Sequence, residues 1–470
     1  MPNPEHVNTL KSGEWDKWRK EFPHITPNFS GANLAGMDLS GKEFRSANFY
    51  RADLRGCNFS SSDVSRSNFK ESQLEKVVFD GAVMDQANFE YVVLNQVPFR
   101  KVSAKSACFR ACPLRGADFS ESELSDAIFE SADISGAVFA GANCPRASFA
   151  GVTIEKTSFA GARCTGATFE SAKGIDADFR KAVLEKATLG KCQFKKSHFQ
   201  NCVFANASAK GIVFVLADFA NADFTNADFT GAFFDKVNFT GSVFSKTLFR
   251  FAKFQNANFL KSRIQGTQFS NASLNEADFT EAFVSDAPNF NEASMKNCKM
   301  NNLSLGNVQF QKAILTGADF RESDLNGANF SYADLRGASL RVASAKKALF
   351  VQTKAISADL SGAVFALADF TSANLQHADF RFSKLIGANL NGANFSYANL
   401  RNANLLEARI KKTLFIGSRL GRVKMKGYLA PRVLYGVVNF VIRLNEKRHE
   451  KRLKEEEERI KRVEQMLSQK

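Results

Sequence analysis

The residues of this 470-residue chain that could bind a metal or form disulfides are eight cysteines and five histidines. Thiolate and imidazole groups bind zinc when four of them converge, usually as closely spaced pairs in the sequence. The histidines are scattered singly, at His6, His24, His198, His377 and His449. The sequence therefore predicts no metal centre and no cofactor.

A five-residue spacing of large apolar residues runs through the chain from residue 29 to residue 425. Phenylalanine occupies every fifth position from 214 to 259. An α-helix returns a side chain to one face every 3.6 residues and a β-strand every two, so neither element places such a series on one surface. A coil that turns a corner every five residues does, and we therefore expect a solenoid. We call the large apolar residue of each repeat its centre.

Several places interrupt this frame, among them residues 344–356, where two centres are alanine. It slips by one residue at 287–289, which we interpret as an insertion at a surface corner. Gly174 and Ala209 stand where a large centre is expected, and we interpret both as structural imperfections.

Most of the cysteines occupy structural positions of the frame. Two residues before each centre the chain places a small residue, and cysteine fills this position as a small apolar residue at Cys57, Cys112, Cys192, Cys202 and Cys298. Cys144 and Cys164 are themselves centres and stand four repeats apart. We interpret them as buried thiols, and a disulfide between them is the alternative.

The short polar motifs also follow from the frame. Asn58-Phe59-Ser60 has the form of a glycosylation site, but Asp, Asn, Ser and Thr recur around every centre because their side chains bond to the backbone at turns. No glycine-rich phosphate loop, nucleophile elbow or carboxylate pair stands apart from this pattern. We expect a protein that is not an enzyme.

Strings such as ADFTNADFTGAFF resemble the repeats of the pentapeptide repeat family, A-(D/N)-(L/F)-x-x, across residues 29–425. The resemblance implies a right-handed parallel β-helix with a square cross-section and four pentapeptides to a coil. At that ratio the frame makes about 20 coils, stacked at the ~4.8 Å strand spacing of a sheet. The expected fold class is an all-β solenoid, a right-handed quadrilateral parallel β-helix with a short N-terminal and a longer C-terminal helical segment.

Centres taken at every fourth repeat form four columns of different character, which supports four repeats per coil. Phenylalanine recurs in one column at Phe109, Phe129 and Phe149, and in a second column at Phe119 and Phe139. We expect these columns to form two facing walls of stacked rings, because offset rings attract at this spacing.

The N-terminal segment, residues 1–28, precedes the repeats. Leu10, Trp15, Trp18 and Phe22 follow one another at helical spacings and predict one amphipathic helix. Such a helix would cover the first coil, whose edge would otherwise expose apolar rings and unpaired backbone groups. The alternative is that Trp15 and Trp18 bind a partner.

The C-terminal segment, residues 428–470, follows the β-helix of residues 29–427. Residues 428–444 are mainly apolar, and residues 445–470 predict a charged helix. Leu453, Ile460 and Leu467 are seven residues apart, which favours a short coiled coil and a homodimer. The segment either caps the last coil or contacts an anionic membrane surface.

Charge provides the remaining candidate site. The formal net charge is +15, and Arg321, Arg341, Arg381 and Arg401 each follow a centre of one column. We expect these arginines to form a row, interrupted at Ser361, on a solvated face where Asp319, Asp359 and Asp379 pair with them. The alternative is a basic surface that binds anionic lipid, nucleic acid or an acidic protein.

The expected function is a non-catalytic scaffold that presents a long surface to a protein partner of unknown identity. An alternative is a peripheral membrane factor held by the C-terminal segment. A third, implied by the resemblance, is a DNA mimic that binds a type II topoisomerase, but such mimics are acidic and this chain is basic. We expect a protein rather than nucleic acid as the partner. The N-terminus lacks the basic-then-apolar run of a secretory signal, so we expect a cytoplasmic location, with the inner face of the membrane as the alternative.

Overall fold

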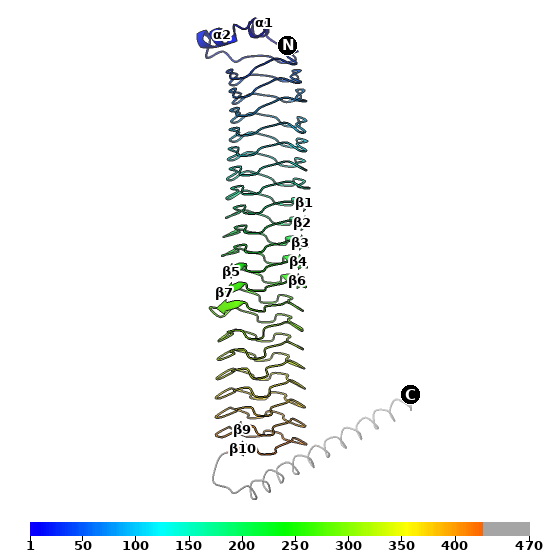
Figure 1. The fold of residues 1–470 in the computed structure, drawn as a ribbon, viewed down its shortest axis with the longest axis vertical. Coiled ribbons are helices and arrows are strands. Elements are labelled where there is room, and N and C mark those ends of the chain that lie inside the picture. Colours follow the sequence, from blue (N-terminus) through cyan, green and yellow to red (C-terminus); the bar gives the residue numbers. More distant parts are fainter. Residues whose placement is uncertain (426–470) are drawn as a thin grey trace, which may run out of the picture. The chain divides into compact units, whose positions relative to one another are not determined.

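The computed structural model describes residues 1–425 and divides the chain into two compact units, Met1–Ala272 and Ser273–Lys470 (Figure 1). Each unit is a β-solenoid with few helices. The predicted C-terminal segment at 428–470, with its helix, coiled coil and membrane contact, lies outside the described residues. The division into 1–28, 29–427 and 428–470 stays a prediction.

The first unit returns to the same face after every fourth repeat. Asn28 bridges Asn48 in parallel, and three further series begin at Asn33, Asp38 and Glu43, so each turn has four faces. The series from Asn28 continues in equal steps to Gln268, and the solenoid counts about 13 turns. The predicted total of about 20 coils and the right-handed sense stay predictions.

Regular strands form on two faces of the first unit. On one face of the first unit, β1 (Lys173–Ile175), β2 (Gln193–Lys195), β3 (Val213–Val215), β4 (Phe233–Asp235) and β6 (Lys253–Gln255) form a five-stranded parallel sheet in this order. On another face, β5 (Val243–Ser245) pairs with β7 (Arg263–Gln265).

The second unit has the same four-repeat register. It contains β8 (Phe283–Ser285), β9 (Asn404–Leu405) and β10 (Lys424–Met425), and β9 pairs in parallel with β10. Pairs that span 287–289 are separated by one residue more than the others, as in Ser273 with Ser294, whereas Asn289 pairs with Gln309 in the ordinary register. The extra residue therefore lengthens one turn by one residue and leaves the pairing between turns intact.

Many corners use the side chain of Asp or Asn as a hydrogen-bond acceptor. Asn48 Oδ1 accepts a hydrogen bond from the backbone N of Tyr50 at 3.1 Å, and Arg51, the next residue, adopts a φ of 57°. Asp218 Oδ1 accepts in the same way from the backbone N of Ala220. This Asx-turn geometry explains why Asp and Asn precede so many centres.

The core of the first unit consists of stacked phenylalanine rings. Phe119 and Phe139 stack with ring centroids 5.0 Å apart at 6°, and Phe129 and Phe149 at 4.9 Å and 7°. Rings from the two columns meet edge to face, as for Phe129 and Phe139 at 5.5 Å and 87°. The predicted facing walls of phenylalanine are confirmed.

Two helices cover the first coil, which corrects the prediction of one continuous helix. The helix α1 (Pro4–Lys11) ends at Ser12, and α2 (Trp15–Glu21) begins after Gly13, whose φ of 84° suits glycine. The break turns α2 so that both α1 and α2 lie over the end of the first unit (Figure 1).

Candidate interaction surface

The second unit brings the four predicted arginines into one column. Parallel bridges join Asp319 to Ser339, Ser339 to Asp359, Asp359 to Asp379 and Asp379 to Asn399. Each bridging residue stands two positions before one outward side chain. The outward side chains are therefore stacked in the order Arg321, Arg341, Ser361, Arg381 and Arg401.

Two of the four arginines in this column form ion pairs with an aspartate two residues earlier in the chain. Arg321 Nη2 lies 2.6 Å from Asp319 Oδ2, and Arg381 Nη2 lies 2.7 Å from Asp379 Oδ2. The hydrogen bond to Asp319 raises the pKa of the Arg321 guanidinium. Asp359 instead accepts a hydrogen bond from Ser361 Oγ at 2.6 Å.

The other two arginines of the column follow Ser339 and Asn399, which carry no charge. Within residues 1–425, the side chains of Arg341 and Arg401 form no ion pair. The column is therefore an alternation of paired and unpaired guanidinium groups, and its use as a binding site stays a prediction.

The replacement Arg321→Ala is expected to leave the free energy of unfolding almost unchanged, because exposed ion pairs contribute little in water. Chemical denaturation of the purified variant would measure this change. Arg341→Ala, which removes an unpaired arginine from the same column, is the matched control. A loss of several kcal/mol for Arg321→Ala alone would contradict the expectation.

The two predicted tryptophans are buried in the first unit. Trp15 is 0% exposed and Trp18 7% exposed, and their rings stack at 5.0 Å. Trp15 also stacks on Phe44 at 5.3 Å and donates a hydrogen bond from Nε1 to the Glu43 carbonyl oxygen at 3.0 Å. The rings thus cover the first coil, as the capping interpretation requires.

The five-stranded sheet of the first unit carries a basic surface that the sequence analysis did not identify. Its outward lysines are exposed, and some of its apolar side chains are half-exposed. We call this surface the lysine face, and define it by Lys173, Lys195, Lys196, Lys236, Lys253, Ile175, Val213, Val215, Leu216 and Phe233.

The lysines of this face differ in their pairing from many arginines of the described residues. Where Asp stands two residues before Arg, as in Asp53 and Arg55 or Asp178 and Arg180, the two side chains form an ion pair at 2.7 Å. In the part of the chain that the structure describes, none of the five lysines forms an ion pair. The chain also contains no acidic residue between Glu185 and Asp218.

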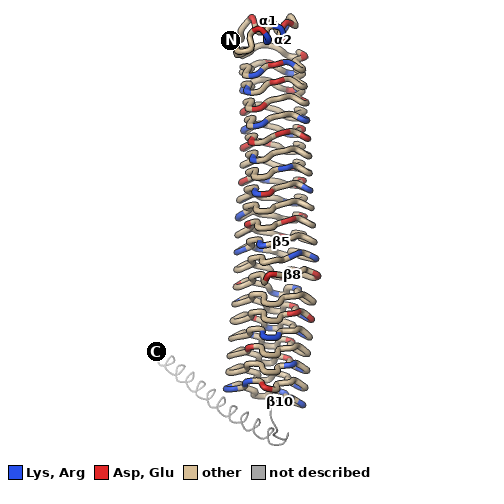
Figure 2. The backbone as a smooth tube through the Cα atoms, turned by 90° about the vertical axis from the view of Figure 1, so that its left-hand side faces the viewer, with Lys and Arg blue, Asp and Glu red and all other residues tan. Residues whose placement is uncertain are grey.

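Basic and acidic residues otherwise occur along both units (Figure 2). The positive charge of the lysine face is therefore local. It arises because β2 lies within the acid-free stretch and β1 is stacked on β2, whereas β4 of the same sheet carries Asp235.

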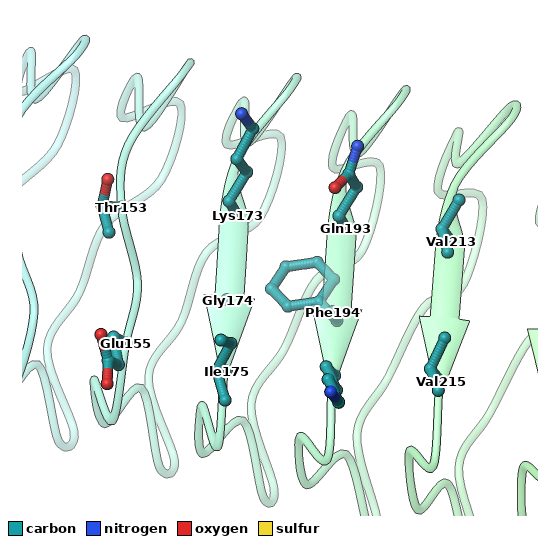
Figure 3. Close-up of a pocket in the computed structure, with 10 residues that line it drawn as sticks. Thr153, Glu155, Lys173, Gly174, Ile175, Gln193, Phe194, Val213 and Val215 are labelled. Carbon is teal, nitrogen blue, oxygen red and sulfur yellow. The ribbon is translucent and has the colours of Figure 1, made fainter.

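Part of the lysine face is hollowed into a groove of about 370 Å³ (Figure 3). Two rows of outward side chains border it, one on each side of the inward-facing centres. The first row consists of Thr153, Lys173, Gln193 and Val213. The second row consists of Glu155, Ile175, Lys195 and Val215. Gly174 and Phe194 lie between the rows and form the floor.

Gly174 is a centre without a side chain, and Phe194 fills the space that it leaves. A Cβ atom at Gly174 would lie 2.8 Å from Cδ1 of the Phe194 ring, which is closer than van der Waals contact. In the sequence, the small residue at the centre position of Gly174 was the feature that could have indicated the groove. The missing side chain does not leave a void, because a ring from the next coil occupies the core beneath it.

The cysteines behave as small apolar residues. All eight are free, so the alternative of a disulfide between Cys144 and Cys164 is not observed. Burial raises the pKa of Cys112 to about 12, and its Sγ donates a hydrogen bond to the Phe89 carbonyl oxygen. Among the described residues, no group of three or more His, Cys, Asp or Glu side chains could hold a metal ion.

Similarity to solved structures concerns the fold. HetL, a pentapeptide repeat protein involved in heterocyst differentiation regulation in the cyanobacterium Nostoc sp. strain PCC 7120, is 23% identical over 52% of this chain and 89% of its own, with a TM-score of 0.25. QnrB1, a plasmid-mediated fluoroquinolone resistance protein, is 17% identical over 53% of this chain and 97% of its own, with a TM-score of 0.20. No curated protein matches the sequence significantly.

Family similarity covers more than half of the sequence. The chain matches the family described as Pentapeptide repeats, in eight copies, within residues 28–66, 162–201, 197–235, 234–271, 304–341, 348–385 and 383–422. Residues 82–159 match the family described as Pentapeptide repeat region. Together with the four-repeat register and the small, Asp/Asn and large apolar positions of each repeat, these matches show that the chain belongs to the pentapeptide repeat family.

Proposed function

We propose that this protein is a non-catalytic scaffold that presents the lysine face of its first unit to a protein partner. The observation that carries the proposal is a set of unpaired lysines around half-exposed apolar side chains on one sheet. Ile175 is 46% exposed and Leu216 44% exposed. Exposed apolar side chains that lie together within a polar rim are typical of a surface that another molecule covers.

The chemistry of the described residues supports a non-catalytic role. A general acid, base or nucleophile needs a pKa near the working pH and access to a substrate. Burial instead raises the pKa of Cys57 to about 11 and that of Cys192 to about 12. Several carboxylates, such as Asp53 and Asp319, are held by an arginine of the same strand.

The other two hypotheses have less support. Among residues 1–425, no helix is long and apolar enough to cross a membrane, and the segment on which peripheral membrane binding depends lies outside the described residues. A mimic of DNA needs rows of negative charge, whereas the most distinct charged surface of the first unit is basic. We therefore favour the scaffold.

The test is a charge reversal of the lysine face by Lys173→Glu, Lys195→Glu and Lys196→Glu. We expect a partner that crosslinks to the wild-type protein in cell extract to be lost, because the sign of the surface is inverted. Quantitative mass spectrometry of crosslinked proteins would measure this loss. The matched control reverses Lys346, Lys347 and Lys354, which are exposed in the second unit and change the net charge equally. If the control abolishes the same crosslinks, or if no protein crosslinks specifically, the proposal is wrong.

A further inference from the structure

The backbone beneath the groove cannot accept an additional strand. β1 is bridged to Thr153 on one side and to β2 on the other, and β2 and β3 each lie between two partners. Strand addition requires an edge with unpaired N–H and C=O groups. A ligand of this face is therefore recognised through side chains, in the groove between the two rows.

The groove has a direction and a length. Each row takes one residue from each of four successive turns, so the groove runs across the strands, along the stacking direction of the first unit. Three steps of the ~4.8 Å strand spacing make it about 14 Å long. An extended polypeptide spans about 3.3–3.6 Å per residue, so about four residues fit along it.

Two lysines and one glutamate border the groove, and this net positive charge favours an acidic ligand. Lys173 belongs to the first row, and Lys195 and Glu155 belong to the second. Each row therefore carries one lysine, and the second row also carries one carboxylate. Both ammonium groups lack an ion-pair partner in the described chain. A carboxylate brought into the groove therefore gains an attraction without breaking an existing ion pair.

The apolar side chains of the groove favour a polypeptide over a nucleic acid. Ile175 in the second row faces the occupant, and Val213 and Val215 close the far end. A phosphate backbone would leave these side chains uncovered, whereas an aliphatic or aromatic side chain would bury them. We propose that the groove binds an extended acidic polypeptide segment that places an apolar side chain against Ile175 and carboxylates beside Lys173 and Lys195.

This inference rests on the proposed scaffold function and identifies the class of its partner. The probe is a fluorescent peptide of about ten residues with alternating Glu and Leu, titrated with the full-length chain and followed by fluorescence anisotropy. Lys173→Glu with Lys195→Glu is expected to weaken binding about tenfold or more. Raising the salt from about 0.1 M to about 1 M shortens the screening length from about 10 Å to about 3 Å and should also weaken binding.

The apolar part of the inference has a separate test. Ile175→Ser is expected to weaken the binding of the Glu/Leu peptide about fivefold, and to leave the binding of a matched Glu/Ser peptide unchanged. The exposed Val342→Ser in the second unit is the control. Equal loss for both peptides would show that Ile175 does not contact the apolar side chain, and would overturn this part.

Three further outcomes would overturn the proposal. A single-stranded oligonucleotide of equal charge that displaces the peptide would identify nucleic acid as the ligand. Peptide binding that survives the lysine reversals would place the site elsewhere. If the lysine reversals abolish the cellular crosslinks but the peptide does not bind, the groove proposal is wrong and the scaffold function stands. If the peptide binds but no cellular protein crosslinks to the lysine face, the scaffold function is wrong and the groove proposal stands.

Discussion

Replacement of Phe139 by alanine is expected to lower the free energy of unfolding of the first unit by about 3–5 kcal/mol. The ring is fully buried, stacks on Phe119 at 5.0 Å and on Phe159 at 4.8 Å, and meets the edges of Phe129 and Phe149. Its removal leaves a cavity that the neighbouring coils cannot close, because their spacing is set by backbone hydrogen bonds. Denaturation followed by circular dichroism would measure the loss.

The control for this prediction is Glu121→Ala in a neighbouring coil. Glu121 is exposed at a corner, and its nearest basic atom, Lys101 Nζ, is 3.7 Å away with both side chains about two-thirds exposed. Its removal should change the free energy of unfolding by less than about 1 kcal/mol. If both variants unfold alike, the phenylalanine stack does not stabilise the first unit in the way that we describe.

Replacement of Trp15 by alanine should expose the end of the first unit, with a local cost of about 3–5 kcal/mol. Trp15 fills the space above Phe29 and Phe44, at 5.3 Å from each ring, and no earlier coil covers these two rings. Hydrogen exchange of the backbone amides from residue 29 to residue 49 would report the opening. We expect fast exchange there and unchanged exchange in the middle of the first unit, because each coil contacts only its neighbours.

The matched control is Lys17→Ala on the same helix. The Lys17 side chain is 80% exposed, and its Nζ lies 4.0 Å from Glu14 Oε2, which makes a weak ion pair. Exchange in this variant should equal that of the wild type. Unchanged exchange in Trp15→Ala would mean that α2 does not protect the first coil.

The core could be predicted from the sequence because its pattern is local. Five-residue spacing determines which side chain points inward, and the small residue two positions earlier determines how close the corner comes to the core. The stacking of Phe119 on Phe139 followed from their separation by four repeats alone. The position of the break between α1 and α2 did not, since Leu10 and Trp15 fit a continuous helix as well as two short helices.

The candidate surfaces could be predicted only in part, because charge depends on pairing. The four arginines were expected in one column, and the bridges place them there, but only the side-chain geometry shows that Arg321 and Arg381 are held by Asp319 and Asp379. The lysine face escaped the sequence analysis for the converse reason. Its lysines follow no repeat of their own, and Lys173 and Lys195 become neighbours only through the stacking of β1 on β2.

The sequence by itself determined the family, the four-faced coil and the inward residues, because every five-residue repeat contains the pattern that specifies them. The tertiary structure alone decided which outward side chains are paired, how the first coil is closed and where a groove forms. The physical reason is that an outward side chain is constrained by no repeat, so its surroundings depend on the residue that stacking places beside it from the next coil. Gly174 shows both contributions. The sequence reveals a centre without a side chain, and the tertiary structure shows that the ring of Phe194 from the next coil fills the core beneath the groove.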